Sequence, residues 1–195
     1  MTVAFVLGNG VSRRGLDLVQ IRNHGFIYGC NGLYRDYTPD VLVATDRPIA
    51  TKIQDTGYAL KHRFHTRKPL NGLGGLTIPD KYYGYSSGPV ALALASLDKN
   101  SIIYFVGFDI GPNSNEKFNN VYADTEFYKT SNSTPTFTGN WIRQIKTVMN
   151  NFVDIKYYRV MGSTSMPIDD FTKCPNYKTI SLDEFKSIIN NKKEP

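Results

Sequence analysis

Short apolar runs without polar interruption are the feature that most limits what this chain can fold into. The clearest are residues 3–7 (VAFVL), 41–45 (VLVAT) and 102–106 (IIYFV), and each is followed by glycine or a polar residue. A strand that is apolar on both faces is typical of a parallel sheet that helices cover on each side. These runs therefore predict the inner strands of a parallel sheet.

Weaker strands and several helices complete the pattern. We expect further strands at residues 26–29, 58–65 and 155–160, and helices at 16–25, 48–55, 89–95, 141–149 and 181–189. Strand, helix and strand at such spacings are typical of right-handed parallel α/β units. The sequence thus predicts an α/β fold, with one doubly wound, Rossmann-like domain over residues 1–190. Its sheet would be mostly parallel with helices on both faces, and residues 191–195 would form a polar tail.

A long polar segment separates the strand at 102–106 from the helix at 141–149. Residues 111–137 are rich in Asn, Ser and Thr, yet they also contain aromatic residues such as Phe118 and Phe127. Loops of this length in a compact domain are usually functional lids or disordered segments. The embedded aromatic residues favour a lid that packs on the rest of the domain.

Charge and cysteine content restrict the partners and the compartment. The net charge of +6 suits an anionic partner, such as nucleic acid, a membrane surface or a phosphorylated small molecule. The basic residues are scattered, so charge alone does not choose among these. No apolar run approaches the roughly 18–20 residues that span a bilayer. Cys30 and Cys174 are too few for a disulfide framework, and residues 1–8 lack the basic start of a secretion signal, so we expect a cytoplasmic protein.

Small and polar residues follow the predicted inner strands. In a parallel α/β sheet, ligands bind at the carboxyl ends of the strands, where backbone amides and helix N-termini point outward. The segments are Gly8-Asn9-Gly10-Val11-Ser12, Gly29-Cys30-Asn31, Thr45-Asp46 and Gly107-Phe108-Asp109, together with Ser86-Ser87-Gly88 before a buried helix. We expect them to meet at one edge of the sheet and to form a pocket for an anionic ligand.

The first glycine turn matches none of the common phosphate-binding motifs. No Gly-Lys-Ser/Thr follows Gly10, so the turn is not a P-loop, and Arg13 stands where the dinucleotide fingerprint requires glycine. A strand followed by Gly-Asn-Gly is also compatible with a tight turn that binds nothing. Asn31 and Asp46 are likewise compatible with simple helix caps.

The ordered set of motifs resembles that of a known superfamily. V-L-G-N-G-x-S, Y-G-C-N, P-D-V-L-V-A-T-D, S-S-G-P and V-G-F-D follow one another over residues 3–110. The set is similar to that of the bacterial sialyltransferases of capsular and lipooligosaccharide synthesis and of their relatives, the motility accessory factors and the archaeal pterin diphosphokinases. The resemblance implies a metal-independent glycosyltransferase with a nucleotide-activated sugar as donor and a glycan or small molecule as acceptor.

The resemblance also implies roles for individual residues. Residues at the strand ends would bind the nucleotide: Gly8, Asn9, Gly10, Ser12 and Asn31 its ribose and phosphates, Ser86, Ser87 and Gly88 a phosphate, and Gly107, Phe108 and Asp109 its base and ribose. Tyr122 and Tyr128 would be catalytic. In the sialyltransferases a pair of tyrosines donates hydrogen bonds to the departing phosphate, a task that needs no metal.

The base that deprotonates the acceptor is the point at which this sequence departs from the sialyltransferases. Their histidine base lies after the lid, whereas the last histidine here is His65. A base would come from Asp46, Asp109, Asp124 or His65, and we take Asp46 and Asp109 as the catalytic candidates.

Two other functions stay open from the sequence. A pterin-type diphosphokinase would need Mg²⁺, with Asp46 and Asp109 as candidate ligands, whereas the transferase would need neither cofactor nor metal. A non-catalytic binder of a nucleotide or nucleic acid is the third hypothesis. Nucleic acid ranks last, because basic and aromatic residues are not interleaved as in RNA-recognition motifs. A homo-oligomer stays open as well.

Overall fold

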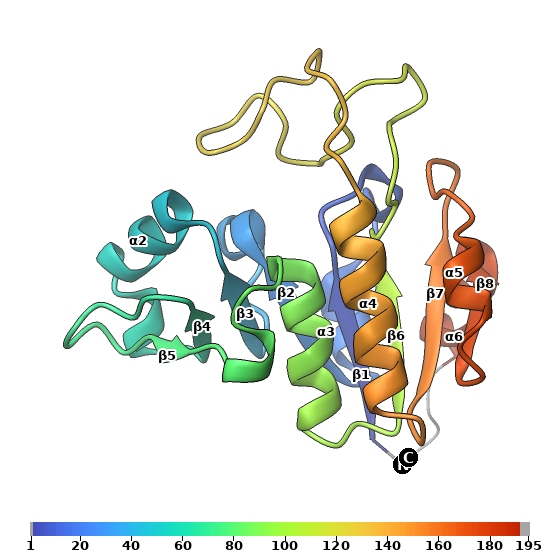
Figure 1. Cartoon of the computed structure of the whole chain (residues 1–195), viewed down its shortest axis with the longest axis horizontal. Helices are drawn as coiled ribbons and strands as arrows, with labels where there is room; N and C mark the ends of the chain where they lie inside the picture. The colour runs from blue at the N-terminus through green and yellow to red at the C-terminus, as the bar shows by residue number, and fades with distance from the viewer. Residues whose placement is uncertain (1, 192–195) are drawn as a thin grey trace.

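The fold is built on one parallel β-sheet (Figure 1). The structure is a computed structural model, and it describes residues 2–191. Within this range the sheet has eight strands in the order β5-β4-β3-β2-β1-β6-β7-β8, and all pairs of neighbours are parallel. The strands are β1 (Val3–Leu7), β2 (Phe26–Cys30), β3 (Val41–Ala44), β4 (Phe64–Thr66), β5 (Leu76–Thr77), β6 (Ile102–Val106), β7 (Lys156–Met161) and β8 (Tyr177–Ser181).

Helices connect the strands. The α-helices are α1 (Leu18–Arg22), α2 (Arg47–Asp55), α3 (Ser87–Leu97), α4 (Gly139–Asn151), α5 (Asp169–Thr172) and α6 (Leu182–Asn190). Short 3-10 helices are η1 (Val11–Arg13), η2 (Asn31–Arg35), η3 (Tyr58–Leu60) and η4 (Asp80–Tyr82). The expected capping box opens α6, where the side chains and backbone of Ser181 and Glu184 bond reciprocally. Among the helices described, none has the length and apolar character of a membrane span.

Side chains of the central strands alternate between two hydrophobic cores. In β1, Ala4 and Val6 pack in the core that contains α3 and α4, whereas Phe5 and Leu7 pack in the core that contains α1, α2 and α6. Figure 1 shows α3 and α4 in front of the sheet. All four side chains are fully buried, which explains why β1 is apolar at every position. The predicted α/β class with helices on both faces is confirmed.

The strand order reverses between β1 and β6. Val6 pairs with Tyr28 of β2 on one side and with Phe105 of β6 on the other. From β1 the chain moves outward as far as β5, and α3 then carries it back to β6. In open α/β sheets such a reversal opens a crevice outside the carboxyl ends of the strands.

The ends of β1 and β6 lie closer together than side chains would allow. A Cβ at Gly8 would lie 2.5 Å from the carbonyl oxygen of Gly107, and one at Gly107 would lie 2.7 Å from that of Gly8. Gly107 also has a left-handed backbone, with φ of 72°. The N–H of Gly10 donates to the Gly107 carbonyl at 2.8 Å. These contacts explain why glycine occupies both positions, whether or not a ligand binds nearby.

Several parts of the chain differ from the sequence prediction, among them the short β5 and α5, which were not expected. The strand expected at 58–65 begins only at Phe64, because η3 follows the left-handed Gly57. Strand β8 was not predicted, since it lies at the edge of the sheet and exposes Lys178 and Thr179 in place of an apolar run. The predicted tail at 191–195 lies outside the described residues, apart from Asn191.

Because the ends of β1 and β6 are in close contact, we expect a methyl group at Gly107 to destabilise the fold strongly. Gly107→Ala should lower the free energy of unfolding by about 2–4 kcal/mol, through the clash with Gly8 and the left-handed backbone. Urea unfolding measures the loss. In the control Gly84→Ala, a Cβ would meet nothing within 4 Å, so the change should stay within about 0.5 kcal/mol. Equal stability of Gly107→Ala and the wild type would contradict this account.

Candidate functional site

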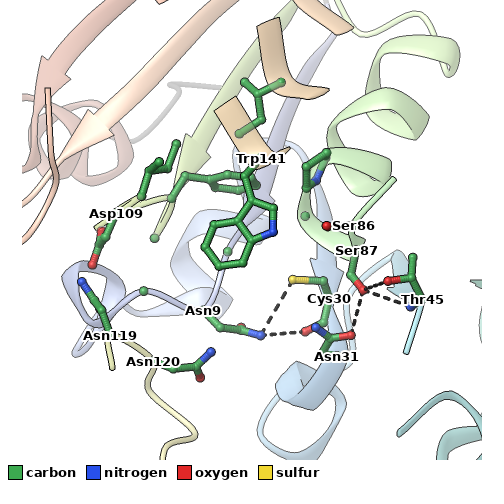
Figure 2. A pocket seen from close by; sticks show the side chains of 18 of the residues that line it. Asn9, Cys30, Asn31, Thr45, Ser86, Ser87, Asp109, Asn119, Asn120 and Trp141 are labelled. Carbon is green, nitrogen blue, oxygen red and sulfur yellow. Dashed lines mark hydrogen bonds between the residues drawn. The ribbon is translucent and has the colours of Figure 1, made fainter. Parts of the chain in front are cut away.

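A pocket of about 210 Å³ opens at the carboxyl ends of β1, β2, β3 and β6 (Figure 2). A single water needs only about 10–15 Å³ of such space, so an organic ligand has room here. Most of the predicted site residues line it: Gly8, Asn9, Gly10, Asn31, Asp46, Ser86, Ser87, Gly88, Gly107, Phe108 and Asp109. Three predicted residues, Ser12, Tyr122 and Tyr128, are not part of its lining. The reversal of strand order thus brings five separate segments together.

Four N–H groups of the first glycine turn are bonded within the protein. Those of Gly8 and Gly10 donate to the end of β6. The N–H of Val11 donates to Asn119 Oδ1 at 2.8 Å, and that of Ser12 donates to Asp109 Oδ2 at 3.0 Å. An anion-binding turn needs donors that point at the ligand. The turn around Gly10 therefore maintains the shape of the pocket, and these four N–H groups are not available for a phosphate.

Asn9 connects three segments at the floor of the pocket. Its Nδ2 donates to the Cys30 carbonyl at 3.2 Å, and its Oδ1 accepts from the Arg13 guanidinium at 3.2 Å (Figure 2 shows the bonds to Cys30). Its backbone carbonyl accepts from the N–H of Val121, in the long loop, at 2.8 Å. Both ends of the Asn9 amide are occupied, so this side chain positions neighbouring segments.

Ser87 joins the start of α3 to the ends of β2 and β3. Its hydroxyl accepts from the Thr45 N–H at 3.0 Å and donates to Asn31 Oδ1 at 2.9 Å, as Figure 2 shows. The Asn31 backbone is left-handed, with φ of 51°. These bonds fix the N-terminus of α3 against the pocket.

The first turn of α3 keeps donors for a ligand. Within the described part of the chain, the N–H groups of Ser87 and Gly88 have no hydrogen-bond acceptor. Both residues line the pocket, and a helix N-terminus carries partial positive charge. This helix end is therefore suited to an anionic group.

Three guanidinium groups near the pocket have only uncharged hydrogen-bond partners. Arg67 lines the pocket, Arg13 lies buried beneath Asn9, and Arg159 is fully buried behind the end of β6. Their partners are Asn9 and the Tyr122 hydroxyl for Arg13, the carbonyls of Thr45, Tyr83 and Tyr85 for Arg67, and the carbonyls of Phe108, Asp109 and Met166 for Arg159. Among the described residues none of the three forms an ion pair. Their charge favours an anion in the pocket.

The two candidate aspartates have different surroundings. The Asp109 carboxylate is buried and accepts hydrogen bonds from Ser12, Thr164 and Ser165, including the Thr164 hydroxyl at 2.7 Å. Asp46 is exposed at the start of α2, and its carboxylate has no hydrogen-bond partner among the described residues. The Asp109 carboxylate thus holds neighbouring segments together, whereas that of Asp46 is available to a substrate.

A second hollow, of about 310 Å³, adjoins the first. The two share Asn31, Asp46, Asn120 and Trp141. Three of the other seven lining residues are aromatic, and most of the seven come from the long loop: Phe118, Phe127, Tyr128, Lys129 and Thr136, with Pro48 and Ile49 of α2. Asp46 therefore lies where a molecule in one hollow would meet a molecule in the other.

Tyr122 and Tyr128 attach the long loop to the domain. The Tyr122 hydroxyl donates to Asp36 at 2.6 Å and accepts from Arg13 at 3.0 Å. The Tyr128 hydroxyl accepts from the Gly32 N–H at 2.8 Å. Burial raises the pKa of both phenols. The loop, which Figure 1 shows above the strand ends, is therefore docked through these two side chains, and Tyr122 has no proton left for a departing phosphate.

The remaining candidates for a base lie elsewhere or are unsuited. His65 is buried in β4, where its Nε2 accepts from Arg63 at 3.2 Å and burial lowers its pKa. Asp124 is exposed on the long loop and accepts from the Ser131 N–H. Neither lines a hollow. Cys30 does line the pocket, but burial raises the pKa of its thiol to about 12, so it stays protonated.

Sequence reasoning missed Trp141 and Arg67. Trp141, the only tryptophan of the chain, stands on the first turn of α4 and lies over the middle of the pocket (Figure 2). A sole tryptophan at the start of an amphipathic helix was a usable signal. Arg67 directly follows β4, the same kind of strand-end position as the other site residues, and it was overlooked there.

No family model, no curated protein and no solved structure matches the chain.

We expect the Tyr122 hydroxyl to contribute measurably to the stability of the protein. Tyr122→Phe removes the partner of both Asp36 and the buried Arg13, and should lower the free energy of unfolding by about 1–3 kcal/mol. Urea unfolding followed by circular dichroism measures the change. Tyr83→Phe is the control, because Tyr83 is 40% exposed and should show less than about 0.5 kcal/mol. An unchanged stability of Tyr122→Phe would argue against the docking role.

Proposed function

We propose that the first pocket binds a nucleotide and that the protein transfers a sugar from a nucleotide-activated donor to an acceptor in the second hollow. One observation carries the proposal: donors without acceptors, the guanidinium group of Arg67, which has no carboxylate partner, and an aromatic ring meet in one pocket at the reversal of strand order. Such a site suits a ligand that is anionic at one end and planar at the other.

The parts of a nucleotide have matching surroundings in the pocket. A phosphate at the start of α3 would accept from the N–H groups of Ser87 and Gly88, with Arg67 as the nearest lining cation. The rings of Trp141 and Phe108, which line the same pocket, offer apolar surfaces for a base. The side-chain amide of Asn31 lies between the phosphate end and the second hollow.

Asp46 is the base that we propose for transfer. Its carboxylate would take the proton of an acceptor hydroxyl as the oxygen attacks the sugar carbon. The bond from that carbon to the phosphate oxygen breaks, and the nucleotide leaves with the electron pair. The N–H groups at the start of α3 would stabilise the charge that develops on this phosphate. No step needs a metal in this scheme.

The diphosphokinase alternative has less support. It requires Asp46 and Asp109 as magnesium ligands, and both line the pocket. The Asp109 oxygens already accept from Ser12, Thr164 and Ser165, so of the two carboxylates only that of Asp46 would be available to the metal. The residues present fit a magnesium site poorly.

Trp141 allows nucleotide binding to be measured directly. Because it is the only tryptophan, its fluorescence reports on the pocket alone. CMP, UDP and their sugar derivatives should quench it with saturation, and the corresponding nucleosides should bind at least about tenfold more weakly, since they lack the group that the charged donors recognise. Trp141→Phe is the blank. Absence of a response to every nucleotide and nucleotide sugar would refute the proposal.

The role of Asp46 predicts a separation of catalysis from binding. Asp46→Asn should lower the rate of transfer, or of donor hydrolysis, by about 10²–10⁴-fold, while fluorescence quenching by the nucleotide stays unchanged. A panel of labelled nucleotide sugars with product analysis gives the rates. Asp154→Asn, an exposed aspartate before β7 at the opposite edge of the sheet, is the control. Unaltered turnover in Asp46→Asn would eliminate this residue as the base.

A further inference from the structure

The chain that follows β6 has an unusual orientation of its peptide groups. Residues 107–111 all line the first pocket. The carbonyl of Gly107 accepts from the Gly10 N–H at 2.8 Å, and those of Phe108 and Asp109 accept from Arg159 at 2.7 and 3.1 Å. All three successive carbonyls are thus bonded to protein groups. That of Gly107 bonds the neighbouring turn, and those of Phe108 and Asp109 bond Arg159, which does not line the pocket.

Two N–H groups of this segment face away from Arg159. In a planar trans peptide, the carbonyl of one residue and the N–H of the next point in opposite directions. The N–H groups of Asp109 and Ile110 therefore point away from Arg159, whereas that of Phe108 points away from Gly10 and so toward β7, on the other side of β6. In the part of the chain that the structure describes, neither the Asp109 N–H nor the Ile110 N–H has an acceptor.

The residues that carry these two donors are buried: Asp109 and Ile110 are only 3% and 6% exposed. A buried N–H without an acceptor is destabilising, and native proteins rarely contain one. Both residues line the first pocket, so a ligand there is a natural source of the acceptors.

Arg159 fixes this orientation. It is fully buried in β7, and its Nε and NH2 groups both donate to the Phe108 carbonyl, at 3.0 and 2.7 Å. Its NH1 donates to Met166 at 2.7 Å. Burial lowers the pKa of Arg159, while Tyr177 and Asp109 oppose the shift; a guanidinium keeps its charge in proteins. A buried cation that bonds only carbonyls is costly, and orienting these carbonyls is what its contacts achieve.

We propose that Arg159 is a positioning residue that turns the N–H groups of Asp109 and Ile110 into the pocket as a second anion subsite. The inference rests on the proposed function for the first subsite, at the start of α3. The residues that carry the two sets of donors line the same pocket, and a Cβ at Gly88 would lie 3.1 Å from the side-chain ring of Phe108. The ligand would carry two neighbouring anionic groups: a diphosphate, or a phosphate ester beside a carboxylate.

The direct test is a titration of ¹⁵N-labelled full-length protein with inorganic pyrophosphate, followed by NMR. The amide protons of Asp109 and Ile110 should move downfield with saturation, and orthophosphate should bind about tenfold more weakly because it fills one subsite only. Titrations with UDP and with a CMP-linked acidic sugar distinguish the two ligand classes. Unmoved amide signals of Asp109 and Ile110 with all of these ligands would overturn the inference.

Substitution of Arg159 separates positioning from general stability. In Arg159→Lys, a single ammonium cannot hold the carbonyls of Phe108 and Asp109 as the guanidinium does. Pyrophosphate affinity should fall about tenfold, and the response of the Asp109 and Ile110 amides should be lost while that of Gly88 persists. Arg63→Lys, in the exposed ion pair with Asp98, is the control. A retained response at Asp109 and Ile110 would overturn the role of Arg159.

Failure of the second anion subsite can be distinguished from failure of the proposed nucleotide binding. Nucleotide quenching of Trp141 with no shift at Asp109 or Ile110 would refute the second subsite alone. Shifts with pyrophosphate in the absence of any nucleotide quenching would support the subsite and refute nucleotide binding. If Arg159→Lys does not fold, the titration of the wild type still decides the matter.

Discussion

The backbone contact between Gly8 and Gly107 is the constraint on which the rest of this structure depends. It joins β1 to β6, the two strands on either side of the reversal in strand order. Because no side chain separates them, the segments that follow both strands start from nearly the same point and then diverge. The Asn9 turn passes beneath the pocket and residues 107–111 form its wall. The pocket forms because β1 and β6 are in contact at their ends and the segments that follow them then diverge.

The inner part of the fold was predictable from the sequence, and its edges were not. β1, β3 and β6 are buried on both faces, and burial on both faces leaves an uninterrupted apolar run that can be recognised in the sequence. β8 lies at an edge, where one face meets water, and its polar residues conceal it. The site followed the same logic: positions directly after the inner strands were predictable, whereas Arg159 contacts the wall of the pocket only through the tertiary structure.

The sequence also could not show which donors and acceptors would remain available. Gly10 and Ser12 stand where a phosphate-binding turn would place them, yet their N–H groups bond to Gly107 and Asp109. Asp46 and Asp109 look alike in the sequence as carboxylates at strand ends. Thr164 and Ser165 donate hydrogen bonds to Asp109 but not to Asp46. These partners lie more than 50 residues away along the chain. Candidate residues can thus be found by pattern, while their chemical availability is a property of long-range contacts.

The three guanidinium groups around the pocket have a consequence for how the protein is handled. A folded state that gathers positive charge without carboxylate partners is less favourable when nothing negative is bound, and any anion that binds only the folded state raises its population. Melting temperature should therefore rise with the phosphate content of the buffer, beyond the effect of ionic strength alone. Material prepared from cells would then tend to retain a tightly held metabolite, which mass spectrometry of the denatured sample could identify.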